Sequence, residues 1–307
     1  MSIRDWSTTQ FASSAAAPVG LGLGPRPFDH ELDLFGITHP GKVRSENQDH
    51  FLLCTVHPQV VVHGTSLPHA DQLPLRGQRL ATLMLVADGV GGLSNGADAA
   101  RIATETITRY VTSTLRCYHT AGSSRDEEFY EALRSAANEA HDAVRADVDA
   151  RQGAGSATTL TLGIVVWPWL YVLQVGDSRC YVYADGSLRQ VTRDQTVAQS
   201  LVDQGLLAAD RLKASPFSHV LASAIGAEQS VPEVTRIDIS ERGSVTLVCS
   251  DGLTKHVRDS EIAEYVRTMR STEQVCRDLL QLALDRGGHD NITIVAGRAP
   301  RATSTGL

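Results

Sequence analysis

Four aspartates in this chain have neighbours that suit a binding site, because each sits beside a small or turn-forming residue. They are Asp49, Asp88, Asp251 and Asp290. Three of them adjoin apolar, β-rich runs, and a glycine beside a carboxylate lets the backbone bend away or approach a ligand closely. Carboxylates gathered from such distant positions repel one another unless a cation lies between them. Ligands that are all oxygen predict a site for hard divalent metal ions.

The composition is ordinary for a soluble globular protein. The 307 residues are 42% hydrophobic and 21% charged, which is enough to bury a substantial core. A net charge of -7 argues against a nucleic-acid partner, because binding nucleic acid needs a basic surface. The five cysteines are scattered without a CxxC pair, as expected for reduced thiols in the cytoplasm and not for disulfides or a zinc site.

The most apolar stretch, Leu160 to Val175, does not predict a membrane span. Trp167-Pro168-Trp169 interrupts it, and its β-branched residues indicate two buried strands around a turn. A spanning helix needs about 20 consecutive apolar residues. The sequence therefore predicts a cytoplasmic protein without a membrane span.

Strands and helices are predicted in blocks. Strands are expected at about 32–38, 50–56, 80–87, 158–166, 171–174, 179–183, 187–190, 234–239, 244–249 and 292–297. Helices are expected at about 97–115, 126–150, 196–204, 260–269 and 272–286. Because the two types do not alternate, they favour an α+β fold with mainly antiparallel sheets over the βαβ units of a dinucleotide fold.

Six short motifs follow one another along the chain, and each alone would be a weak signal. They are Gly41-x-x-Arg44-x-x-Asn47-Gln48-Asp49, Val86-Ala87-Asp88-Gly89-Val90-Gly91-Gly92, Gly155-Ser156-Ala157-Thr158-Thr159, Val175-Gly176-Asp177-Ser178-Arg179, Cys249-Ser250-Asp251-Gly252-Leu253-Thr254 and Gly287-Gly288-His289-Asp290-Asn291-Ile292-Thr293. In this order and spacing, the chain resembles the metal-dependent protein phosphatases (the PPM family, or type 2C serine/threonine phosphatases) of the bacterial kind. The resemblance covers about Leu34 to Gly297.

The resemblance implies a four-layer α-β-β-α sandwich, in which two mainly antiparallel sheets are flanked by helix pairs. The phosphatase domain would span residues 31–298, with a flap beside the active site at about 192–230 and an insertion at about 57–78. Residues 1–30 would form a flexible N-terminal extension, and residues 299–307 a C-terminal tail.

The resemblance also implies the ligands of two Mn²⁺ or Mg²⁺ ions. These are Asp49, Asp88, Asp251, Asp290 and the backbone carbonyl of Gly89. Asp177, together with Asp251, would contribute to a third, weaker metal position. An alternative for Asp177 is that it only caps the turn between two strands.

Arg44 would hold the substrate phosphate, a role that suits a planar guanidinium with paired donors. Its alternative is a surface residue in a polar loop. Two metals about 4 Å apart can share a bridging water, lower its pKa and hold it for in-line attack on the phosphoryl group. This chemistry needs no Ser or Cys nucleophile.

Three residues depart from the family pattern or add to it. Gln48 stands where many members carry Glu, and Val90 stands where some eukaryotic members carry a histidine that is thought to protonate the leaving group. His289 is a candidate for that acid, although an exposed loop histidine is the preferred interpretation. The resemblance therefore leaves the general acid open.

The function implied is that of a serine/threonine phosphoprotein phosphatase, with a phosphorylated protein as substrate and an opposing kinase as partner. One alternative is a pseudophosphatase that binds phosphoproteins, but all five aspartate positions are filled. Another alternative is a metal-dependent hydrolase of a small phosphorylated molecule. The flap sequence does not distinguish this function from that of a phosphoprotein phosphatase.

Overall fold

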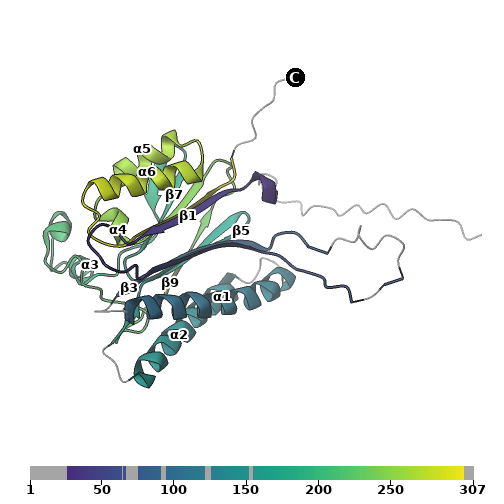
Figure 1. Ribbon diagram of the computed structural model, residues 1–307, viewed down its shortest axis with the longest axis horizontal. Helices are drawn as coiled ribbons and strands as arrows, with labels where there is room; N and C mark the ends of the chain where they lie inside the picture. Colours follow the sequence, from purple (N-terminus) through teal and green to yellow (C-terminus); the bar gives the residue numbers. More distant parts are fainter. Residues whose placement is uncertain are drawn as a thin grey trace, which may run out of the picture.

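The computed structural model describes residues 26–63, 65–66, 75–90, 95–121, 126–151 and 155–300. Two sheets lie face to face, with long helices on the outside of each (Figure 1). One outer layer holds α1 (Asn95–Ala121) and α2 (Asp126–Ala150), and the other holds α5 (Asp259–Thr268) and α6 (Thr272–Asp285). The expected four-layer α-β-β-α sandwich is therefore confirmed.

The first sheet has the strand order β1-β11-β10-β7-β8, and every neighbouring pair in it is antiparallel. Its strands are β1 (Asp33–His39), β7 (Arg179–Ala184), β8 (Ser187–Gln190), β10 (Val245–Cys249) and β11 (Ile292–Arg298). The strands from the two ends of the domain, β1 and β11, thus lie side by side. This pairing brings the motif that begins at Gly41 next to the motif that ends at Thr293.

The second sheet has the order β2-β3-β5-β6-β9, with the short β4 paired to the end of β3. Its strands are β2 (Asp49–Val56), β3 (Ala81–Val90), β4 (Ala157–Thr158), β5 (Leu160–Val166), β6 (Trp169–Val175) and β9 (Glu233–Asp238). The neighbours are again antiparallel.

The helices α1, α2, α5 and α6 cover the outer faces of the sheets through apolar stripes. The helices of the described residues are α1 (Asn95–Ala121), α2 (Asp126–Ala150), α3 (Val197–Asp203), α4 (Asp251–Thr254), α5 (Asp259–Thr268) and α6 (Thr272–Asp285), with 3-10 turns η1 (Asp29–Glu31) and η4 (Ala209–Ala214). In α2, Phe129, Leu133, Ala137, Ala140 and Val144 are all buried, as their three- and four-residue spacing predicts.

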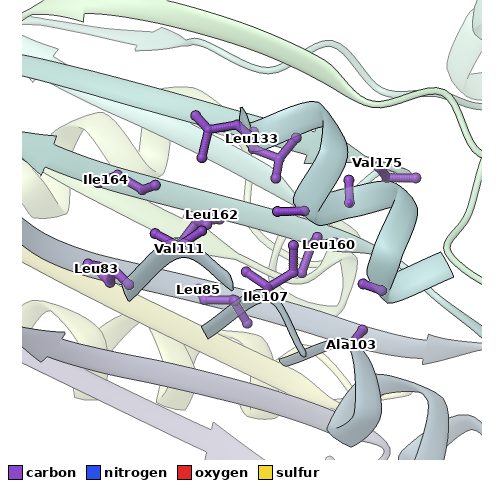
Figure 2. Close-up of a cluster of buried hydrophobic side chains, with 14 of the residues drawn as sticks. Leu83, Leu85, Ala103, Ile107, Val111, Leu133, Leu160, Leu162, Ile164 and Val175 are labelled. Carbon is purple, nitrogen blue, oxygen red and sulfur yellow. The ribbon is translucent and has the colours of Figure 1, made fainter. Parts of the chain in front are cut away.

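Three apolar layers hold the sandwich together. The largest lies between α1, α2 and the second sheet, where Ile107 and Leu133 face Leu83 and Leu162 (Figure 2). A second cluster lies between the two sheets, and a third joins the first sheet to α5 and α6. Packing of this kind makes the ends of the strands a rigid base for loops.

The predicted elements agree with the observed ones within a few residues, with two main differences. The first long helix runs from Asn95 to Ala121, beyond the expected 97–115. The single-turn helix α4 was not predicted, because an Asp-Gly pair directly after a strand indicates a turn.

The proposed extension and insertion are only partly described. Residues 1–25, 64, 67–74 and 301–307 lie outside the described residues. Within the extension, Pro27 and Asp29 accept hydrogen bonds from buried Arg79 at 2.9 and 2.5 Å. In the insertion, Gln59 pairs with Arg76 as an isolated bridge. None of the helices in the described ranges combines the length and hydropathy needed to cross a bilayer.

Candidate metal and phosphate site

Two of the four aspartates lie opposite each other in the second sheet. Asp49 is the first residue of β2, and its cross-strand partner in β3 is Asp88. Side chains at directly opposed positions are roughly 5 Å apart at Cβ, and two like charges there destabilise the pair. This register places two buried carboxyl groups together, where a cation or a proton must balance them.

The other two aspartates lie at the same end of the first sheet. Asp251 follows β10 and Asp290 precedes β11, and these strands are antiparallel neighbours with Cys249 opposite Ile294. Asp177 lies in the turn from β6 to β7, and Arg179 at the start of β7 is opposite Cys249. Both sheets therefore deliver acidic side chains to one end of the sandwich.

A cavity of about 800 Å³ opens at this end. Its lining consists of Arg44, Ser45, Glu46, Gln48, Asp88, Gly89, Val90, Asp177, His219, Val220, Leu221, Asp251, Lys255, Asp290 and Asn291. All of the expected site residues except Asp49 are in this lining. Asp49 is 3% exposed and lies beneath it, beside Asp88.

The carboxylate of Asp49 is held on one side only. Its Oδ2 accepts hydrogen bonds from Ser250 Oγ at 2.8 Å and from Thr293 Oγ1 at 2.7 Å. Its Oδ1 is buried without a hydrogen-bond partner, as is Oδ1 of Asp251. A buried, unpartnered carboxylate oxygen costs free energy unless a ligand satisfies it. These two oxygens fit the role of metal ligands.

The backbone around Asp88 is held by hydroxyl groups. Asp88 N donates to Thr159 Oγ1 at 3.1 Å, and Asp88 O accepts from Thr158 Oγ1 at 2.9 Å. The following residue, Gly89, has no room for a side chain, because an added Cβ would lie 2.4 Å from the carbonyl oxygen of Gly96. Glycine is therefore required here for close packing of the strand end against the start of α1.

The buried carboxyl groups have raised pKa values. Burial is the main cause for all three, and it raises the pKa of Asp49 to about 6, that of Asp177 to about 8 and that of Asp88 well above its usual value. Repulsion by neighbouring carboxylates adds to the effect, and Asp88 is repelled by all four of the others. The five aspartates thus form one electrostatic cluster, which a multivalent cation would stabilise.

Two cations contact the more exposed part of this cluster. Arg44 donates from Nε and Nη2 to the two oxygens of Asp290, at 2.8 and 3.1 Å. Lys255 Nζ lies 2.6 Å from Asp251 Oδ2 and 2.8 Å from Asp290 Oδ2. Burial alone would raise the pKa of Asp290, but the hydrogen bonds from Arg44 and Lys255 outweigh it and hold that pKa below its usual value.

The carboxylates do not all surround a single point. Among the described residues, no three Asp, Glu, His or Cys side chains are grouped as ligands of one ion. Asp290 is instead turned toward Arg44 and Lys255. The donor set still fits Mg²⁺ or Mn²⁺, because it consists of oxygens, two of which are buried and unpartnered. Binding two ions would require Lys255 and Arg44 to release some of these oxygens.

Three supporting residues were not predicted from the sequence. Ser250 and Thr293 orient Asp49 from the other sheet through hydrogen bonds. In the sequence, the only indication of this role is that Ser250 directly precedes Asp251 and that Thr293 ends the last motif. Lys255 follows Asp251 by four residues, a spacing that brings side chains together on a helix. Recognising α4 would have indicated this pair.

Asn291 fixes the loop that carries Arg44. Its Nδ2 donates to the carbonyl oxygens of Pro40 and Glu46, both at 2.9 Å. Its Oδ1 accepts from Gln48 N at 2.8 Å. The amide therefore ties the segment before β2 to the start of β11.

The position of His289 does not favour it as the general acid. His289 is exposed, lies outside the cavity lining and stacks on His256, with its Nδ1 3.0 Å from His256 Nε2. Val90 lines the cavity but carries no proton to donate. The structure supports the interpretation of His289 as an exposed loop residue.

The segment expected as a flap contains α3 and η4 and contributes His219, Val220 and Leu221 to the lining. Asp194 attaches its first residues to the sheet, because both of its carboxylate oxygens accept hydrogen bonds from Arg179, at 2.8 and 2.6 Å. This segment therefore forms one wall of the cavity.

The model of the protein phosphatase 2C family matches residues 64–285. The serine/threonine protein phosphatase PstP of Mycobacterium tuberculosis is 30% identical over 216 residues, 70% of this chain and 40% of that protein. The serine/threonine phosphatase Stp of Listeria welshimeri is 26% identical over 259 residues, 84% of this chain and 92% of that protein.

A solved structure of the catalytic domain of PstP in complex with two manganese ions has the same fold. It is 25% identical, with a TM-score of 0.66, and the match covers 88% of this chain and 99% of that one. The present chain spans only 40% of the length of the PstP protein itself. The family match covers most of the chain, and five of the six motifs contribute residues to one cavity: the chain belongs to the protein phosphatase 2C family.

Proposed function

We propose that the protein is a metal-dependent serine/threonine phosphoprotein phosphatase. The observation that carries this proposal is the pair of buried, unpartnered oxygens on Asp49 and Asp251, beside an open cavity that also contains Arg44. Such oxygens suit a bound cation, and the cavity gives a phosphorylated side chain access to it. The relatives named as serine/threonine phosphatases support the same reaction.

The metal ligands we propose are Asp49, Asp88, Asp251, Asp290 and the carbonyl oxygen of Gly89. Two divalent ions bound there would supply Lewis acidity and an activated water for in-line displacement at phosphorus. The PstP structure with two manganese ions supports this number. Asp177 is proposed for a third, weaker position with Asp251, supported by its burial and its repulsion by Asp251.

Arg44 is the proposed phosphate ligand. Its side chain is 58% exposed at the cavity, and its guanidinium already binds a planar carboxylate through two N–H groups. Phosphate oxygens present a similar pair of acceptors to this fork. Arg44 would therefore exchange Asp290 for the substrate phosphate, which frees the Asp290 oxygens for metal.

The remaining expectations from the sequence stay proposals. These are the domain span 31–298 with its flap at 192–230 and insertion at 57–78, the N-terminal extension, the C-terminal tail, the cytoplasmic location and an opposing kinase. Wall residues of the flap, such as Val220, would then contact the substrate beside its phosphorylated residue.

Hydrolysis assays with added metal test the proposal. We expect hydrolysis of an aryl phosphate in Mn²⁺, its loss in excess chelator, and hydrolysis of phosphoserine or phosphothreonine peptides. Asp251→Asn removes the negative charge of a proposed metal ligand at nearly constant side-chain volume and should abolish turnover. Asp142→Asn, on the exposed face of α2, should leave turnover unchanged.

Two outcomes would replace the proposal with an alternative. Activity on the aryl phosphate without activity on any phosphopeptide would indicate a hydrolase of small phosphorylated molecules. No turnover at saturating Mn²⁺, with phosphopeptide binding retained, would indicate a phosphoprotein-binding module.

A further inference from the structure

Lys255 lies between two of the proposed metal ligands. Its Nζ is 2.6 Å from Asp251 Oδ2 and 2.8 Å from Asp290 Oδ2, and it lines the cavity. One turn of α4 separates it from Asp251, whose carbonyl oxygen accepts the Lys255 N–H at 2.8 Å. The backbone thus fixes the lysine beside the aspartate.

The Lys255 side chain is charged and only partly solvated. It is 26% exposed, and its partners Asp251 and Asp290 are 18% and 21% exposed. Burial by itself would lower the pKa of Lys255, but attraction to Asp251 and the hydrogen bonds to both aspartates outweigh it and raise that pKa. Ion pairs in such a partly buried place are stronger than those on an open surface.

The ammonium group uses oxygens that a metal ion would need. Asp290 is contacted by both Lys255 and Arg44, so each of its oxygens has a cationic partner. A divalent ion bound to Asp251 and Asp290 would have to displace at least one of the Lys255 contacts. It would also bring its own charge close to that of the lysine.

We propose that Lys255 is an internal counter-ion of the acidic cluster, which holds Asp251 and Asp290 together in the metal-free protein and competes with metal for their oxygens. This role rests on the proposed metal function of the two aspartates. Lys255 is then a positioning residue that sets metal affinity. It neither ligates the metal nor reacts with the substrate.

The proposal predicts two effects of opposite sign when the charge of Lys255 is removed. The metal-free protein should become less stable, because two neighbouring carboxylates lose their common cation. Metal should bind more tightly, because its competitor is gone. A lysine with a merely structural role would destabilise both forms and leave metal affinity unchanged or weaker.

Calorimetric titration of the full chain with MnCl₂, at fixed pH and ionic strength, measures the affinity directly. We expect the Kd of Lys255→Met to fall by roughly tenfold relative to the unsubstituted protein. Lys255→Arg, which keeps the charge, should restore a Kd near the original value. Lys42→Met is the matched control, because Lys42 is exposed in the Arg44 loop and outside the cavity lining. Its Kd should stay within roughly twofold.

Thermal unfolding with and without Mn²⁺ gives the second readout. The Tm of metal-free Lys255→Met should be lower than that of the original protein, and the Mn²⁺-induced rise in Tm should be larger. Lys255→Gln keeps hydrogen-bond donors and loses only the charge, so it should show the same changes if the Met variant does not fold.

Two results would overturn the inference, and they are distinguishable. If the original protein binds Mn²⁺ and the neutral variants bind it equally or more weakly, Lys255 does not compete with metal, although the proposed function stands. If the original protein shows no Mn²⁺ binding at all, the proposed metal site and this role of Lys255 both fail.

Discussion

Replacing Asp49 by Asn should stabilise the metal-free protein while abolishing metal binding. Asp49 is 3% exposed, lies opposite Asp88 and has one oxygen without a partner. Asn has nearly the same volume, and its carbonyl oxygen can still accept the hydrogen bonds from Ser250 and Thr293. Its NH₂ group would take the place of the unpartnered Oδ1, and the change would remove a buried charge that Asp251 repels.

The magnitude follows from the raised pKa of Asp49. Burial raises this pKa from 3.8 to about 6, which corresponds to about 3 kcal/mol of destabilisation once the group is ionised. Because the folded-state pKa lies above the unfolded value, the stability associated with Asp49 is full below about pH 4 and is lost as the pH rises through about 6. The advantage of Asp49→Asn should therefore be small near pH 4 and reach about 3 kcal/mol at pH 7.5.

Urea unfolding in excess chelator measures this difference in the free energy of unfolding. At pH 5 the advantage should be about half of its value at pH 7.5. The matched control is Asp142→Asn, which removes a charge from the exposed face of α2 and should change stability by less than about 0.5 kcal/mol. In parallel, the Mn²⁺-induced rise in Tm should disappear only in the Asp49 variant.

Two results would refute this reasoning. One is an Asp49→Asn protein that is less stable than the original at pH 7.5 in chelator. The other is an advantage that does not change between pH 5 and 7.5. Either result would mean that the Asp49 carboxylate is not destabilised in the metal-free fold.

Three further changes test other parts of the site. Thr293→Val removes one hydrogen-bond donor to Asp49, so the free energy of unfolding at pH 7.5, measured in urea, should fall by about 2 kcal/mol. Thr293→Ser keeps the hydroxyl group and should leave the free energy of unfolding nearly unchanged. Equal stabilities of the two variants would contradict the hydrogen bond. Gly252→Ala places a Cβ 1.8 Å from the carbonyl oxygen of Asn291. We therefore expect the free energy of unfolding to fall by more than about 3 kcal/mol, or the variant not to fold. A stable variant would show that this loop can move. Arg44→Lys keeps the charge but loses the paired N–H donors, so kcat/KM for phosphopeptides should fall by roughly tenfold or more. The affinity for Mn²⁺ should be largely retained. An unchanged kcat/KM would show that Arg44 does not bind the phosphate.

The sequence predicted the individual helices and strands well because they depend on local patterns, whereas the four layers were implied by the family resemblance. Five of the six apolar residues of α2 that repeat at three- and four-residue spacing are buried, and the sixth, Val148 near the helix end, is half-buried. The predicted boundaries of this helix, 126–150, are those observed. Strands such as β8 and β11 were also placed within one residue. Helix and strand boundaries can be predicted from hydrophobic periodicity and turn residues, which are patterns within a few neighbouring positions.

The gathering of the aspartates could be predicted only through the family resemblance. That Asp49 lies opposite Asp88 depends on the register of β2 and β3, which the turn between them and side-chain packing determine together. That Ser250 and Thr293 reach Asp49 depends on how one sheet packs on the other. Neither relation leaves a pattern in the sequence near Asp49.

The ion pairs of the cavity were beyond sequence reasoning for a similar reason. Arg44 and Asp290 are 246 positions apart, and only the pairing of β1 with β11 brings their loops together. The contact of Lys255 with Asp251 is local but depends on α4, a helix too short to show periodicity. Side-chain choices between competing partners follow from three-dimensional electrostatics.

Crystals of the full chain grown with Mn²⁺ test the central claim most directly, through anomalous difference density collected near the manganese absorption edge. We predict two strong peaks at the cavity, within about 2.5 Å of oxygens from Asp49, Asp88, Asp251 and Asp290, with Lys255 turned away from at least one aspartate. An anomalous difference map at saturating Mn²⁺ that shows no peak among these carboxylates, with Arg44 and Lys255 still bound to Asp290, would contradict the claim of a two-metal site.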